Sequence, residues 1–377
     1  MDLFVYGTLQ DQELRNAVAG PGGTLVAACL HGYGIRPLAG SVVPVLVAEP
    51  EGATSGLLWS GLNDDQCARL ALYEGAFGYH LIPVTVTRTD GTQVVAQMWS
   101  PPEEAEAGRG DWSLSHWQTA YGAASVLAAE ELFSQIPRPT AAMLRWQFPM
   151  MQKRAWNRVT AARQAAPATL RHAPEPCDLS IDEKAPLLGG FFRLQAFGVS
   201  HRRFDQTWQQ TLPREVFVGI DAVLVLPYDP VSERVVLVEQ LRMGAAIRDD
   251  NNPWVLEPVA GMIDAFESPE QAALRETREE AGLDVTLRHV ASCYPSPGNA
   301  TDFFYTYIGL CSLPEPGSYH GGLATEQEDL RLHILSLDDA LALVETGEIN
   351  AGPGIMLLYW LAMQRSALRL EFAPPAA

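Results

Sequence analysis

Three glutamates recur at short intervals in residues 261–283, which read GMIDAFESPEQAALRETREEAGL. Glu276, Glu279 and Glu280 stand at positions i, i+3 and i+4, so on a helix their carboxylates share one face about a turn apart. Carboxylates gathered in this way repel one another, and a hard divalent cation with oxygen ligands relieves the repulsion. The spacing therefore predicts a metal site, with Mg²⁺ as the expected ion and Mn²⁺ as the alternative.

The neighbouring residues predict where this helix begins and ends. Ser268 is suited to the N-cap, Pro269 to the first turn, and Gln271 to completing a capping box. Gly282 is a typical C-terminal cap. The alternative interpretation is a solvated acidic helix face, which is what most charged runs are. Seven specified residue types at this spacing would arise by chance at only about one in a hundred million starting positions in unrelated sequence, which favours the metal site.

The same stretch resembles the Nudix box, the signature of a family of pyrophosphate-cleaving hydrolases. Two predicted strands precede the core, FFRLQAFGVSHRRFD and QTWQQTLPREVF. With AVLVLPYDPV, VVLVEQLR, PWVLEPVAGMI and YPSPG, this region is similar to the ADP-ribose pyrophosphatase branch, which includes proteins associated with tellurite resistance. The resemblance implies Mg²⁺-dependent hydrolysis of ADP-ribose to AMP and ribose 5-phosphate. Another nucleoside diphosphate sugar is the alternative substrate.

This resemblance also implies roles for individual residues. The metal ligands would be Glu276, Glu279, Glu280, the carbonyl of Ala260, and Glu328 from a later loop. Glu279 would also be catalytic, and Glu326 on the same later loop would be the base that activates water. Arg275 would orient a box glutamate. The implied substrate-binding residues are Arg242 as a phosphate clamp, Arg214 and Glu215 near the adenine of a partner subunit, and Pro297 and Gly298 beside the terminal ribose.

A second candidate site lies near the N-terminus. Tyr6, Gly7, Thr8 and Leu9 end the first predicted strand, and a glycine-bearing turn there can expose backbone N–H groups to a carboxylate or carbonyl. Glu74 follows a helix predicted over residues 64–73.

Together with Pro44, Gly56 and Tyr79, these residues resemble the γ-glutamylcyclotransferase-like (AIG2-like) family, whose fold is a small mixed β-barrel. The resemblance implies that Glu74 is the acid/base that converts a γ-glutamyl compound to 5-oxoproline. Such a base works best half-buried, with its pKa raised towards neutrality. Two interpretations stay open, an active cyclotransferase and a ligand-sensing domain without activity that regulates the second half of the chain.

We therefore predict an α+β and α/β protein of two domains. Residues 1–120 would form the γ-glutamylcyclotransferase-like barrel, residues 121–172 a helical linker, and residues 173–377 a Nudix α/β/α sandwich with an extra N-terminal sheet. In the pyrophosphatase branch the extra sheet is exchanged between two subunits, which implies a homodimer through residues near 180–220.

The composition narrows the partners to small molecules. Acidic residues outnumber basic ones by 45 to 26, giving a net charge of −19, which argues against nucleic acid and anionic membrane surfaces. The five cysteines form neither a CxxC motif nor a zinc-binding spacing. Without a signal-peptide pattern at the N-terminus, these features predict a cytoplasmic protein.

Overall fold

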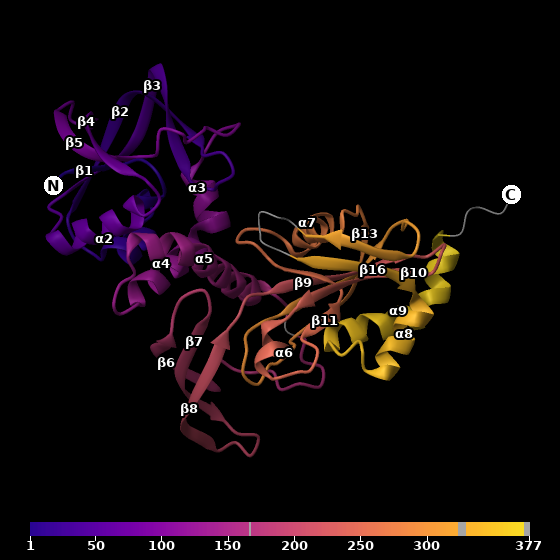
Figure 1. Ribbon diagram of the computed structural model, residues 1–377. Helices are drawn as coiled ribbons and strands as arrows, with labels where there is room; N and C mark the ends of the chain where they lie inside the picture. Colours follow the sequence, from indigo (N-terminus) through magenta and orange to yellow (C-terminus); the bar gives the residue numbers. More distant parts are fainter. Residues whose placement is uncertain (166, 323–328, 373–377) are drawn as a thin grey trace. The chain divides into compact units, whose positions relative to one another are not determined.

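The computed structural model describes residues 1–165, 167–322 and 329–372, without the side chains of residues 185–188 (Figure 1). The chain forms two compact units, Met1–Arg214 and Glu215–Ala377. This division is coarser than the predicted one at residues 120 and 172, and those boundaries stay a prediction. No helix in the described part of the chain is long and apolar enough to cross a membrane.

The first unit begins with the predicted small mixed barrel. Five strands close it in the order β1-β3-β2-β4-β5, with β1 and β5 parallel and the other pairs antiparallel. The strands are β1 (Leu3–Val5), β2 (Thr24–Pro37), β3 (Pro44–Ser60), β4 (His80–Arg88) and β5 (Gln93–Ser100). Gly56 permits the close approach of β1 to β3, since a β-carbon there would lie 2.5 Å from the Val5 carbonyl oxygen.

Helices pack on this barrel and share an apolar core with it, which includes Leu14, Trp59 and Leu70. They are α1 (Gln12–Ala19), α2 (Asp64–Gly75), α3 (Leu114–Trp117), α4 (Ala123–Ser134) and α5 (Ala141–Arg163). Asn63 and Gln66 form a capping box at the start of α2. This helix continues two residues beyond the predicted end, so Glu74 lies in its last turn rather than after it.

A three-stranded sheet lies at the end of the first unit, and its last strand continues past Arg214. Its strands β6 (Leu179–Leu188), β7 (Arg193–Arg202) and β8 (Trp208–Val218) lie in sequence order. Arg154 of α5 is 2% exposed, forms an ion pair with Glu131 at 2.6 Å, and donates to the Phe191 carbonyl at 2.9 Å. Because each N–H of this buried guanidinium needs an acceptor, Arg154 links α4, α5 and the turn between β6 and β7.

The second unit is the predicted α/β/α sandwich. Its mixed sheet has the order β13-β14-β9-β10-β16-β15, with β11 beside β10 and β12 beside β9. The strands are β9 (Ala222–Asp229), β10 (Arg234–Leu241), β11 (Trp254–Glu257), β12 (Val259–Met262), β13 (Thr286–Cys293), β14 (Phe304–Leu310), β15 (Gly317–Gly321) and β16 (Leu330–Ser336). The short helix α6 (Met243–Ile247) follows β10.

Two separate apolar cores explain why β9 is a continuous apolar run. Val223 and Val225 face a core that includes Ala272 and Ala273 of α7 (Pro269–Ala281). Leu224 and Leu226 face the opposite core, formed with α8 (Leu337–Thr346) and α9 (Gly352–Phe372). Figure 1 shows α7 on one side of this sheet and α8 with α9 on the other. A strand covered on both faces has no position for a solvated side chain.

Candidate active sites

Helix α7 carries the three glutamates, and the predicted caps hold its ends. The Ser268 hydroxyl accepts from the Gln271 N–H at 3.2 Å, and the Gln271 side chain accepts from the Ser268 N–H at 2.9 Å. Pro269 is the first helical residue, and Gly282 ends the helix in the left-handed region with φ 66°. The glutamates therefore sit on a helix whose length and rotation are fixed at both ends.

The carboxylates of two box glutamates lie against β12. Glu280 is 3% exposed and accepts a hydrogen bond from the Ala260 N–H at 3.2 Å. The Glu276 carboxylate lies so close to Gly261 that a β-carbon at position 261 would be 1.9 Å from its carboxyl carbon. Any side chain at position 261 would therefore displace the Glu276 carboxylate, although the φ of Gly261 is not positive.

Arg275 lies among the acidic side chains. Its guanidinium donates to Glu267 at 2.9 and 3.0 Å, to Glu276 at 2.7 Å and to Glu279 at 2.9 Å. These contacts, with the Glu267 hydrogen bonds foremost, raise the pKa of Arg275 further above its usual range. Arg275 therefore neutralises part of the carboxylate repulsion from which the metal site was predicted. The predicted orienting contact of Arg275 with the box glutamates is present.

The predicted metal ligands suit a hard cation, since each of them would bind through an oxygen atom. Within the described residues, no group of three or more His, Cys, Asp or Glu side chains is arranged around a point that could hold a metal ion. Arg275 and the Ala260 N–H donate hydrogen bonds to carboxylate oxygens of the box glutamates. Glu326 and Glu328 lie outside the described residues. The metal site therefore stays a proposal.

A cavity of 220 Å³ in the second unit brings several predicted residues together. Arg242, Ala260 and Gly261 all line it, and so do Glu257 and Phe304. Arg242 donates to Glu257 through Nε at 2.6 Å, so the predicted phosphate clamp is held by a carboxylate. Glu257 was not predicted from the sequence, although an acidic residue that ends an apolar stretch three positions before Ala260 was a usable signal.

Four other predicted substrate residues are exposed and are not among the residues that line this cavity. Arg214, on β8, donates through Nη1 to the Pro213 carbonyl at 2.8 Å, and Glu215 follows it. Pro297 and Gly298 lie in a turn closed by the Ala300 N–H and the Ser296 carbonyl at 3.1 Å. Their assignment to the adenine and the ribose stays a prediction.

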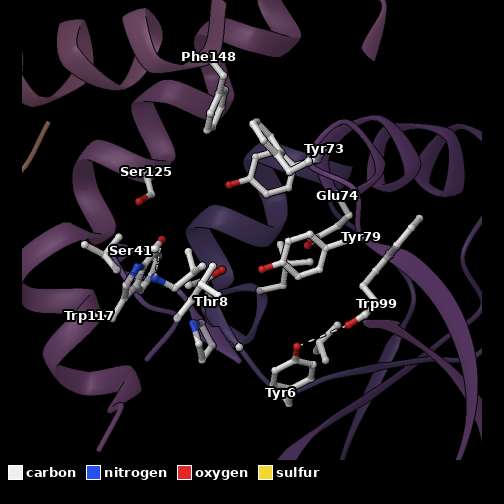
Figure 2. Close-up of a pocket in the computed structure, with 18 of the residues that line it drawn as sticks. Tyr6, Thr8, Ser41, Tyr73, Glu74, Tyr79, Trp99, Trp117, Ser125 and Phe148 are labelled. Carbon is white, nitrogen blue, oxygen red and sulfur yellow. Dashed lines mark hydrogen bonds between the residues drawn. The ribbon is translucent and has the colours of Figure 1, made fainter. Parts of the chain in front are cut away.

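A second cavity, of 290 Å³, lies in the first unit (Figure 2). The Tyr6, Gly7, Thr8 and Leu9 segment lines it together with Glu74, as the sequence predicted for one site. Thr8 begins a short 3₁₀ turn after β1. Gly7 is required by close packing, because a β-carbon there would lie 2.9 Å from Cγ of Pro44.

Glu74 has the environment expected of a general base. It is half-buried at the cavity wall, and burial raises the pKa of its carboxyl to about 7. Burial, and then the charge of Glu74, raise the pKa of Tyr79 to about 12, so Tyr79 keeps its hydroxyl proton. The Tyr6 hydroxyl points to the Trp99 carbonyl oxygen at 3.5 Å (Figure 2). The cavity thus contains one carboxyl that titrates near neutral pH among protonated hydroxyls.

The helices after the barrel supply part of this cavity, which the sequence did not predict. Trp117 of α3, Ser125 of α4, and Phe148 and Gln152 of α5 line it. The last three belong to residues 121–172, which we expected to be only a linker. Their hydrophobic pattern was readable, but which face of each helix meets the barrel depends on tertiary packing.

A mixed sheet between helical layers, with a capped glutamate helix against its central strands, defines a hydrolase of the Nudix class. The chain belongs to the Nudix family and is a Nudix hydrolase: residues 220–354 match the model described as NUDIX domain, and residues 3–118 match Gamma-glutamyl cyclotransferase, AIG2-like. The expected pair of domain families is confirmed. The association with tellurite resistance stays a prediction.

Curated relatives resemble the C-terminal half. ADP-ribose pyrophosphatase of Escherichia coli strain K12 is 39% identical over 197 residues, covering 52% of this chain and 93% of the relative. The protein of the same name from Haemophilus influenzae is 34% identical over 195 residues, covering 51% and 89%. GDP-mannose pyrophosphatase of Citrobacter koseri is 32% identical over 149 residues, covering 39% and 76%.

Proposed function

We propose that the second unit hydrolyses ADP-ribose to AMP and ribose 5-phosphate with Mg²⁺ or Mn²⁺. One observation carries the proposal: Glu276 and Glu280 lie against the Ala260–Gly261 segment, and this segment lines the cavity that Arg242 also lines. The names of the relatives with the greater identity support ADP-ribose as the substrate.

Different residues of the chain would bind the metal, bind phosphate and activate water. Glu276, Glu279, Glu280, the Ala260 carbonyl and Glu328 would hold the metal. When bound, a divalent ion supplies positive charge to the pyrophosphate oxygens. Arg242 binds a phosphate oxygen in exchange for its Glu257 partner. Glu326 accepts a proton from the water whose oxygen attacks phosphorus, while the bridging P–O bond breaks and one phosphate leaves on each product.

The alternative is another nucleoside diphosphate sugar, which the similarity to GDP-mannose pyrophosphatase supports. The same metal site and the same phosphate clamp would serve it. The two substrates differ in the base and the distal sugar.

The replacement of Glu280 by Gln tests the metal site. Glu280→Gln keeps the side-chain length but removes a negative ligand, so ADP-ribose hydrolysis falls about 10²-fold or more. Glu270→Gln is the matched control, because Glu270 is exposed in the first turn of the same helix. Wild-type activity in Glu280→Gln would refute the metal site.

A second function, in the first unit, is favoured by Glu74 at the wall of the N-terminal cavity. We propose that it cyclises a γ-glutamyl amide to 5-oxoproline. The α-nitrogen forms a bond to the δ-carbon, which is the carbonyl carbon of the γ-amide. The bond from that carbon to the leaving nitrogen breaks, and Glu74 moves one proton from the α-nitrogen to the leaving nitrogen. Release of 5-oxoproline by wild type and its loss in Glu74→Gln is the test. Binding without release would favour the sensor alternative.

We also propose that the chain acts in the cytoplasm as a homodimer joined through the three-stranded sheet. Leu179, Ile181 and Trp208 on that sheet are 52%, 58% and 45% exposed, an apolar surface that a partner subunit would cover. The alignment with the Escherichia coli relative spans 197 residues, which is more than the Glu215–Ala377 unit contains. It therefore includes residues that precede this unit. The five free thiols are in keeping with a reducing compartment.

A further inference from the structure

The N-terminal cavity has an unusual charge content for a site that would receive an amino-acid derivative. Among the described residues that line it, Glu74 is the only one with an ionisable acidic or basic side chain apart from the tyrosines. The other polar members are neutral, and they include Thr8, Ser41, Ser125 and Gln152. No lysine, arginine or histidine of this lining is placed to pair with a carboxylate, and no second carboxylate is placed to pair with an ammonium group.

One side of the cavity is built from aromatic rings. Phe148 of α5 packs edge-on against Tyr73, with 6.0 Å between the ring centroids, and in a tilted orientation against Phe77, with 5.1 Å between the centroids. Trp117 is 1% exposed and lines the cavity from α3. In Figure 2, Phe148 and Tyr6 lie at opposite ends of the labelled group, with Glu74 between them. The base therefore stands between the Tyr6 segment and an aromatic wall contributed by the helices.

We propose that the amine released from the γ-glutamyl substrate is an apolar one, with an alkyl or arylalkyl group and no second charge, and that Phe148 and Phe77 contact that group. This inference rests on the proposed cyclotransferase function of the first unit. A charged end on the leaving amine would be buried without a partner, which is costly, whereas an alkyl chain gains from contact with the rings. An amino acid as the leaving amine would bring a carboxylate towards Glu74 with no cation in the lining to receive it.

Three γ-glutamyl amides with the same five-carbon chain before any charged group test this selectivity. They are the pentylamide, the 5-aminopentylamide and the amide of 6-aminohexanoate, which end in a methyl, an ammonium and a carboxylate group. With the full chain, we expect kcat/KM for 5-oxoproline release to be at least about tenfold higher for the pentylamide than for either charged compound. Equal or higher values for a charged compound would overturn the inference.

A negative charge introduced in the cavity lining should reduce the preference for the pentylamide over the 5-aminopentylamide. Gln152→Glu places a carboxylate in the cavity, so the preference for the pentylamide over the 5-aminopentylamide should narrow at least about fivefold. Arg158→Gln makes the same change in net charge at an exposed position of the same helix and should leave the ratio unchanged. An equal shift in both variants, or no shift in Gln152→Glu, would contradict the placement of the leaving amine beside Phe148, which precedes Gln152 by one turn of α5.

Binding measurements distinguish the inference of an apolar leaving amine from the proposed cyclotransferase function. If none of the three compounds releases 5-oxoproline, the cyclotransferase function fails, and calorimetry with the same compounds decides the selectivity. Tightest binding of the pentylamide supports an apolar ligand group. Tighter binding of a charged compound, or no binding by any of them, overturns the inference.

Discussion

The Glu276 carboxylate rests on the backbone of Gly261, with no room for a β-carbon between them. Gly261→Ala therefore displaces a proposed metal ligand without changing its charge. We expect hydrolysis of the nucleotide substrate to fall about 10²-fold, since a shift of about 1 Å in a reacting group has effects of that size. Gly244→Ala is the control, because a β-carbon there meets nothing within 4 Å. A Gly261→Ala enzyme with the wild-type rate would show that the position of Glu276 is unimportant.

Arg275 and the metal compete for the same carboxylates in this account. Arg275→Gln removes the cation that contacts Glu267, Glu276 and Glu279, so the variant should lose about 2 kcal/mol of stability without metal. Added Mg²⁺ should then raise its melting temperature more than that of wild type. Arg278→Gln serves as the control, because Arg278 on the same helix is exposed and pairs with Asp284. The same Mg²⁺-induced rise in all three proteins would argue against a metal at these glutamates.

The pH profile of 5-oxoproline release should report the Glu74 carboxyl. Burial raises its pKa to about 7, and only the ionised form can accept the proton of the α-amine. Activity should therefore rise as pH increases from about 6 to 8. A rate that is already at its maximum at pH 5 would exclude Glu74 as the base.

The same pKa also links Glu74 to stability. The carboxyl has an ordinary pKa of 4.5 and one of about 7 in the fold, so the folded state favours the protonated form. Relative to that of Glu74→Gln, the free energy of unfolding of the first unit should therefore be highest below about pH 4.5. It should fall by roughly 3 kcal/mol as pH rises through 7. Chemical denaturation of both proteins across this range measures the difference. A difference that does not change with pH would contradict the raised pKa.

The assembly prediction concerns the exposed apolar residues of the three-stranded sheet. Light scattering at micromolar concentration should give the mass of two chains for wild type. Ile181→Glu should shift the mass towards one chain, because a charge would enter the apolar contact. Val231→Glu is the control, since Val231 is 74% exposed and lies outside that sheet. A fully active wild-type monomer would rule out the shared sheet.

Local chemistry explains what could be predicted from the sequence. The caps at Ser268 and Gly282, the continuous apolar strand at β9 and the Tyr6 to Leu9 segment depend on neighbouring residues, so their patterns were readable. The ion pair of Arg242 with Glu257 and the contribution of Phe148 to the N-terminal cavity depend on long-range packing. The contact of Arg275 with Glu279 was also predictable from the sequence, because residues at i and i+4 are neighbours on a helix.

Hydrolysis of matched nucleotides tests the central claim most directly. With Mg²⁺ and the full chain, kcat/KM should be at least about tenfold higher for ADP-ribose than for GDP-mannose or NADH, because pocket contacts to the base and distal group decide between them. The products from ADP-ribose should be AMP and ribose 5-phosphate in equal amounts. A higher kcat/KM for GDP-mannose, or no cleavage of ADP-ribose with either Mg²⁺ or Mn²⁺, would contradict the proposed function.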